Sequence, residues 1–82
     1  SSADADASTF ALVALSRAYL RQKNVRAAGR LLESAVARGI DDARIYAALA
    51  DVYKAGGYFE NAIPAMRRAI EKEPKSEYYR AQ

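Results

Sequence analysis

The side chains that most often perform catalysis are sparse in this sequence. It contains no His and no Cys, which removes the usual zinc ligands and the usual thiol or imidazole partners of nucleophilic catalysis. Most carboxylates fall on expected solvent faces or helix ends, and Asp51, the only one expected on an inner face, has no second carboxylate beside it at helical spacing. A hydrolase that uses two carboxylates is therefore poorly supported.

Two adjacent glycines, Gly56 and Gly57, also invite a chemical interpretation. A phosphate-binding loop would follow a strand, whereas these glycines separate two helical patterns. Each Gly costs a helix interior about 1 kcal/mol, and a turn lets one of them adopt a positive φ. The pair therefore predicts a turn, and we expect a non-enzymatic chain with no catalytic residue, no cofactor and no metal site.

Arginine remains as a residue type with defined ligand chemistry, because its guanidinium pairs with carboxylates or phosphates through two parallel hydrogen bonds. Two arginines recur with apolar residues at helical spacing in one stripe: Phe10, Val13, Arg17, Leu20 and Arg21. The stripe is distinct from the packing face of the same predicted helix, which carries Leu12, Leu15, Ser16 and Tyr19. Packing does not need this second stripe, so it is a candidate contact surface.

The elements that position these side chains are predicted to be helices, because apolar residues recur at intervals of three and four. One pattern is Tyr46, Leu49, Ala50 and Tyr53, and the next is Phe59, Ala62, Ile63, Met66, Ala69 and Ile70. Small residues within each stripe let two backbones approach, which predicts two antiparallel helices. Enlarging Ala62 to Leu is expected to cost roughly 1–3 kcal/mol. Pro64 predicts a distorted first turn or a helix that starts after Phe59.

The same pattern occurs earlier in the chain. Laying the segment 9–42 on the segment 43–76 gives five identities: Ala14 with Ala48, Leu15 with Leu49, Tyr19 with Tyr53, Ala28 with Ala62, and Ala35 with Ala69. Between the helices, Asn24 is expected to be an N-cap or a left-handed residue, and Gly39 and Ile40 are expected to end a helix. Asp41 and Asp42 are N-cap candidates for the helix that follows.

These residues resemble the tetratricopeptide repeat, a helix-turn-helix unit of about 34 residues. The second copy supplies Tyr46, Leu49, Ala50, Tyr53, Ala62, Met66, Ala69 and Pro74 at the pattern's positions. The first copy supplies Leu12, Leu15, Ser16, Tyr19, Ala28, Leu32, Ala35 and Ile40. The departures are Ser16, which is still small, and Ile40 in place of proline.

The resemblance implies an all-α fold of two antiparallel helix-turn-helix repeats in a right-handed superhelical stack, with a short fifth capping helix as an option. Residues 9–76 would form the repeat domain, divided into 9–42 and 43–76. Residues 1–8 lack apolar periodicity and are expected to form a flexible tail, with Ser8 or Thr9 as the first N-cap. Residues 77–82 are expected to begin a capping or following helix.

The resemblance further implies a protein-protein interaction or scaffold module whose concave groove is lined by the first helix of each repeat. The groove positions transfer to the stripe already described and to a second set: Arg44, Ala47, Asp51, Lys54 and Ala55. Four basic groups against one Asp make this groove positive. The expected partner is therefore a peptide or protein segment with acidic residues beside an apolar anchor.

Two other functions are alternatives. Exposed repeat ends could stack on a second copy, which makes self-assembly the main rival. The net charge of +3 and a pI near 9.4 permit nucleic-acid contact through Arg26, Arg30 and Arg38, but no aromatic residue interleaves with them, so this is the minor alternative. No apolar run approaches the roughly 18 residues of a membrane span. The compartment stays open, with the cytoplasm slightly favoured over the periplasm.

Overall fold

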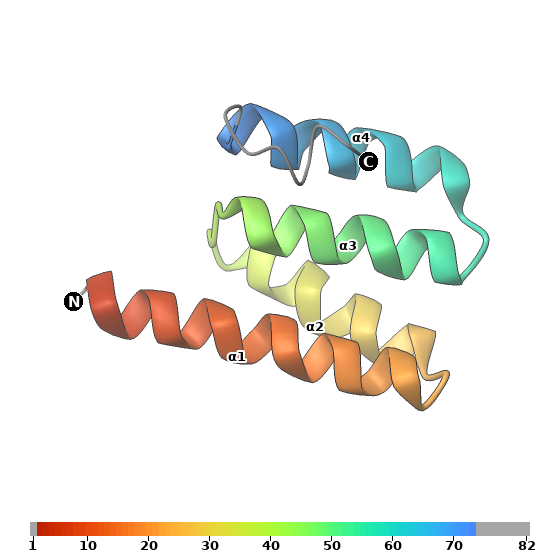
Figure 1. Ribbon diagram of the computed structural model, residues 1–82, viewed down its shortest axis with the longest axis horizontal. Coiled ribbons are helices and arrows are strands. Elements are labelled where there is room, and N and C mark those ends of the chain that lie inside the picture. The colour runs from red at the N-terminus through yellow and green to blue at the C-terminus, as the bar shows by residue number, and fades with distance from the viewer. Residues whose placement is uncertain (1, 74–82) are drawn as a thin grey trace.

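The computed structural model describes residues 2–73, which form four helices and no strand (Figure 1). In chain order they are α1 (Ser2–Arg21), α2 (Val25–Ala37), α3 (Ala43–Ala55) and α4 (Phe59–Lys72). The predicted all-α, helix-turn-helix fold is confirmed for this part of the chain. The expected capping helix at residues 77–82 lies outside the described residues.

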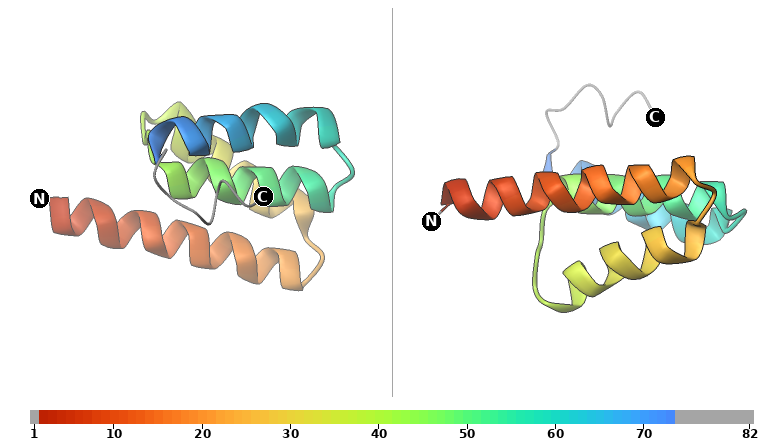
Figure 2. Two further views of the ribbon diagram at one scale, coloured as in Figure 1. Left: turned by 45° about the horizontal axis from the view of Figure 1, so that its top comes forward. Right: turned by 90° about the horizontal axis from the view of Figure 1, so that it is seen from below.

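Helix α3 is the centre of the arrangement, because it packs against each of the other three helices. Figure 1 shows α1 and α3 side by side and running in the same direction, with α4 on the other side of α3. Helix α2 lies behind α1 and α3 in that view, as the right-hand panel of Figure 2 makes clear. The neighbouring α1 and α3 thus present one shared surface to solvent.

The turn that joins α1 to α2 has the same hydrogen bond as the turn that joins α3 to α4. The amide of Asn24 donates to the carbonyl of Tyr19 at 2.8 Å. The amide of Tyr58 donates to the carbonyl of Tyr53 at 2.7 Å. This bond back to the last helical turn belongs to the Schellman type of helix ending. The two hairpins therefore share backbone geometry at equivalent positions of the two sequence copies.

One residue in each of these turns takes a left-handed conformation. It is Gly57 in the second hairpin, at φ 82°, and Lys23 in the first, at φ 60°. The expectation for Asn24 is confirmed as an N-cap, since its side chain accepts a hydrogen bond from the amide of Ala27 at 3.2 Å. Lys23 thus adopts the left-handed conformation that Gly57 adopts without steric penalty in the second turn.

In the connection from α2 to α3, the predicted residues end the first helix and cap the second. Gly39 has φ 93°, and the amide of Ile40 donates back to the carbonyl of Ala35 at 3.1 Å. Asp42 is the N-cap of α3, with its carboxylate accepting a hydrogen bond from the amide of Arg44 at 2.8 Å. These contacts fix where α3 begins and so which of its side chains face α1.

The prediction of a tail over residues 1–8 is wrong for residues 2–8, which form the first turns of α1. Alanine is the best helix former, and Asp4 in the first turn is favoured by the helix dipole. Thr9, a proposed N-cap, lies inside the helix and is only 5% exposed. The figures show this end of α1 extending past the start of α3 (Figures 1 and 2).

Small side chains mark the places where helices approach each other. The residues predicted for this role are all buried: Ser16, Ala28, Ala35, Ala50, Ala62 and Ala69. The hydroxyl of Ser16, which is 1% exposed, donates to the carbonyl of Val13 at 2.7 Å, so its burial leaves no polar group without a partner. Larger residues, above all Leu32 and Ile45, fill the space between these contacts.

The predicted packing stripes are wrong at several large residues. Leu15 is 44% exposed although the identical Leu49 is 5% exposed. Phe59 and Ile63, on the stripe of α4, are 63% and 55% exposed. Leu49 lies on α3, which has a helix on each side, whereas α1 and α4 are the outer helices of the described part.

Pro64 lies inside α4, which begins at Phe59, so the alternative of a later helix start is wrong. Proline removes the hydrogen bond to the carbonyl four residues earlier, which here belongs to Glu60. Both Pro64 and Glu60 are exposed, so water can solvate that carbonyl.

Candidate functional site

A pocket of about 430 Å³ lies on the surface shared by α1 and α3. Its walls contain seven of the ten predicted groove residues, together with Ala14: they are Phe10, Val13, Arg17 and Arg21 from α1, and Arg44, Ala47 and Asp51 from α3. Each set falls on one helical face because its members are three or four residues apart. The structure therefore brings together most of the predicted groove residues, of which the α1 set rests on spacing and the α3 set on the family resemblance.

Three predicted groove residues do not line this pocket. Leu20 is partly buried and packs against the core. Lys54 contributes instead to a pocket between α3 and α4, and its ammonium lies 3.7 Å from the carboxylate of Asp51. Ala55 is exposed at the last position of α3. The pocket therefore extends less far along α3, toward the turn between α3 and α4, than the sequence predicted.

Ala14 also lines the pocket, although it is not among the predicted groove residues. It lies four residues after Phe10 and three before Arg17, so helical spacing alone could have placed it there. Its short side chain leaves room between the two larger neighbours. The apolar part of the floor also contains Val13, which is 9% exposed, whereas Phe10 stands at the rim and is 69% exposed.

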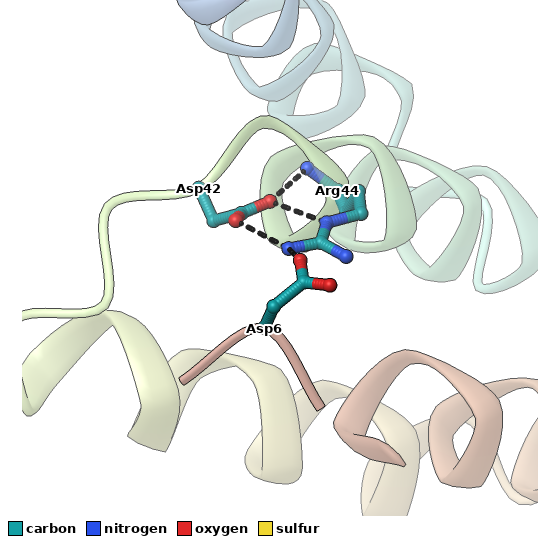
Figure 3. A network of polar contacts seen from close by, with 3 residues as sticks. All are labelled: Asp6, Asp42 and Arg44. Atoms are coloured by element: carbon teal, nitrogen blue, oxygen red, sulfur yellow. Dashed lines mark hydrogen bonds and ion pairs between the residues drawn. The ribbon is translucent and has the colours of Figure 1, made fainter. Parts of the chain in front are cut away.

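Arg44 is held by two carboxylates at one end of the groove (Figure 3). Its Nε and Nη2 atoms donate to the two oxygens of Asp42 at 3.0 and 2.9 Å. The same Nη2 atom lies 2.6 Å from Oδ1 of Asp6, which comes from the N-terminal turns of α1. The contact with Asp6 therefore ties the extension of α1 to the start of α3.

These contacts shift the pKa values of the groups involved. Hydrogen bonds from Arg44 lower the pKa of Asp42 below the ordinary Asp value, against the opposing effect of partial burial. The hydrogen bond to Asp42 is also the main cause of a raised pKa for Arg44, with Asp6 adding to it. Arg44 is thus a charge that already has its counterions within the protein.

Asp42→Ala is expected to lower the free energy of unfolding at neutral pH by about 1 kcal/mol, because the N-cap of α3 is lost. Asp42→Asn keeps a capping oxygen and should lose less. Because folding lowers the pKa of Asp42, its stabilisation is complete above the ordinary Asp pKa of about 3.9 and is lost as the pH falls through the folded-state value. Urea unfolding at a series of pH values should therefore show a weaker acid dependence for Asp42→Ala. An unchanged acid dependence would contradict this assignment.

Arg17 and Arg21 differ from Arg44, because neither forms an ion pair within residues 2–73. Both are exposed and lie on successive turns of α1. The sequence places four basic groups against one Asp in the groove, but Arg44 and Lys54 each have a carboxylate partner. The positive character of the groove is therefore concentrated at Arg17 and Arg21.

No group of three or more carboxylates that could hold a metal ion occurs in the described part of the chain. No helix of residues 2–73 combines the length and apolarity that crossing a membrane requires. The groove offers guanidinium groups, one carboxylate and an apolar floor. That set of groups can recognise a ligand through charge and apolar contact.

The architecture belongs to the class of proteins built from antiparallel helical hairpins, each closed by a tight turn. Residues 43–76 match the family model of the tetratricopeptide repeat, and this segment, which includes α3 and α4, is therefore a tetratricopeptide repeat. The match does not extend to α1 and α2, which are related to it by the repeated sequence pattern and the common turn geometry. Comparisons with curated proteins and with solved structures gave no match. Tetratricopeptide repeats are generally protein-protein interaction modules.

Proposed function

We propose that the groove between α1 and α3 binds a segment of a partner protein that carries acidic residues beside an apolar side chain. The observation that carries the proposal is the pair Arg17 and Arg21, which line the pocket without an ion-pair partner in residues 2–73. A guanidinium binds a carboxylate through two parallel hydrogen bonds and so fixes the ligand's orientation.

The apolar part of the groove supports the same kind of ligand. Phe10 exposes 69% of its surface at the rim, and Val13 and Ala47 line the pocket nearby. Burial of apolar surface contributes roughly 25 cal/mol per Å² removed from water, so a Leu or Phe side chain placed here would add affinity that charge alone does not give. The combination favours a mixed acidic and apolar segment over a purely acidic one.

Arg17→Ala combined with Arg21→Glu is expected to weaken binding of such a segment by about tenfold or more, since each charge-assisted contact contributes roughly 1.5–3 kcal/mol. The probe is a fluorescein-labelled peptide in which Leu-Phe is flanked on both sides by Asp and Glu. Affinity is measured by fluorescence anisotropy, and circular dichroism checks that helicity is unchanged. A version of the peptide with Asn and Gln in place of Asp and Glu reports the contribution of charge.

The matched control is Arg26→Ala with Arg30→Glu, which makes the same change of charge on α2. Those two arginines line a different pocket, beside Tyr58, and are not part of the groove. Equal losses from the two double variants would mean that binding depends on overall charge, and retained binding by the Arg17 and Arg21 variant would refute the groove assignment.

Self-assembly is the second candidate, and exposed apolar residues on the outer helices favour it. Leu15 on α1 is 44% exposed and Ile63 on α4 is 55% exposed. A helical hairpin that stacked on either helix would bury these side chains. Sedimentation across a range of concentrations separates the two functions, because a chain that remains a monomer at high concentration argues against stacking.

A further inference from the structure

We propose that Asp6 is an internal competitor for acidic ligands, which restricts binding of a ligand's acidic group to the Arg17 and Arg21 end of the groove. The inference rests on the proposed function and adds a specificity-determining residue to it. The carboxylate of Asp6 forms an ion pair with the guanidinium of Arg44, which is the third arginine of the groove. An acidic group of a partner would therefore compete with Asp6 for Arg44.

The contact has the chemistry of the ligand that the groove is expected to bind. A carboxylate oxygen of Asp6 lies 2.6 Å from Nη2 of Arg44, a short charge-assisted distance. Arg44 lines the same pocket as Arg17 and Arg21. An acidic side chain of a partner that approaches Arg44 would meet a carboxylate of like charge, and it would have to displace Asp6 to pair with Nη2.

Asp6 is held more weakly than the other partner of Arg44. Asp42 accepts three hydrogen bonds from Arg44, two from the guanidinium and one from the amide, and its side chain is 29% exposed. Asp6 makes one contact with Arg44, and its side chain is 67% exposed. Exposed ion pairs contribute little stability, so Asp6 is the carboxylate that a ligand can replace.

The two ends of the groove therefore differ in charge. Beside one end Asp6 and Asp42 outnumber Arg44, which alone of these three lines the pocket, and at the other end Arg17 and Arg21 have no ion-pair partner in residues 2–73. Asp51, which also lines the pocket, lies 3.7 Å from the ammonium of Lys54. A ligand whose acidic residues lie on one side of its apolar anchor is consequently expected to bind in one orientation.

Asp6 also stands apart from the repeated pattern. When the first copy is laid on the second, Asp6 falls on Ile40, an apolar residue of the turn between α2 and α3. Asp6 comes instead from the turns of α1 that precede residue 9, where the repeated pattern begins. The restriction is therefore a property of this chain's extended first helix.

The test compares Asp6→Asn with Glu60→Gln, each of which removes one exposed negative charge. Glu60 lies on α4, outside the groove, and forms no ion pair within the described residues. With the doubly flanked acidic peptide, Asp6→Asn is expected to raise affinity by about 1.4- to fivefold, the range that an exposed ion pair of roughly 0.2–1 kcal/mol corresponds to. Glu60→Gln should leave affinity within error, and neither variant should change binding of the neutral peptide.

A direct readout is the Nε–H resonance of Arg44 in NMR spectra during peptide titration. It should move more in Asp6→Asn than in the unmodified chain, because the ligand then reaches Arg44. An unchanged affinity and an unmoved resonance in Asp6→Asn would overturn the inference, while loss of binding in the Arg17 and Arg21 variant would still support the groove. Failure of the unmodified chain to prefer the acidic over the neutral peptide would overturn both.

Discussion

Ile45→Ala is expected to lower the free energy of unfolding by roughly 2–5 kcal/mol, the range observed when a fully buried aliphatic side chain is truncated. Ile45 is 0% exposed and belongs to the core cluster that includes Leu32 and Leu49. It lies on α3, which packs against the other three helices of the described part, so truncation would leave a cavity in the core that joins them. Urea unfolding followed by far-ultraviolet circular dichroism measures the loss.

Ile63→Ala is the control for Ile45→Ala, because it makes the same chemical change on α4 at a side chain that is 55% exposed. Substitutions at such positions usually stay within about 0.5 kcal/mol. Comparable losses at the two positions would mean that Ile63 is covered in solution, and this would favour stacking of the outer helix on another surface.

The helices and their turns could be predicted from the sequence because their causes are local. Spacing of three and four residues defines a helical face, and Gly57 or Asn24 marks a turn through its own conformational preference. The repeated pattern adds a long-range constraint. It places Ala28 and Ala62 at equivalent positions of two hairpins, and so predicts that both alanines are buried in the same kind of helix contact. Both are buried, at 0% and 6% exposed.

The N-terminal turns of α1 could not be predicted by the same means. Residues 3–8 are all exposed, so no apolar stripe forms there to reveal a helix. The alternating Ala and Asp residues do not predict a helix, because helix propensity is a weak signal without burial. One contact that ties these turns to the rest, Asp6 with Arg44, joins residues far apart in the chain.

The groove shows the same division between local and long-range information. Seven of the ten residues predicted from helical spacing and from the family resemblance line one pocket. The sequence predicts a positive groove from its basic residues, but it does not reveal the counterions of Arg44, which come from outside the predicted stripes: Asp6 precedes the stripe of α1, and Asp42 precedes α3. A count of basic residues on a face therefore overstates its charge when acidic residues lie at the starts of the helices.

Ala28→Leu is expected to lower the free energy of unfolding by about 1–3 kcal/mol, because the larger side chain overpacks the core. Ala28 lies on α2, is 0% exposed and belongs to the main core cluster. Leucine is at least as compatible with a helix as most residues, so a loss of this size would report the close approach of neighbouring helices. The measurement is again urea unfolding, with the denaturant dependence compared to confirm that both chains unfold in the same way.

Two further leucine substitutions show whether packing is the cause. Ala11→Leu, at an exposed position of α1, should change stability by less than about 0.5 kcal/mol. Ala62→Leu should cost less than Ala28→Leu, because Ala62 borders an open pocket of about 260 Å³ into which leucine can extend. If Ala28→Leu were tolerated as well as Ala11→Leu, the space between α2 and its neighbours would be larger than the structure shows, and the role assigned to small residues in joining the helices would be wrong.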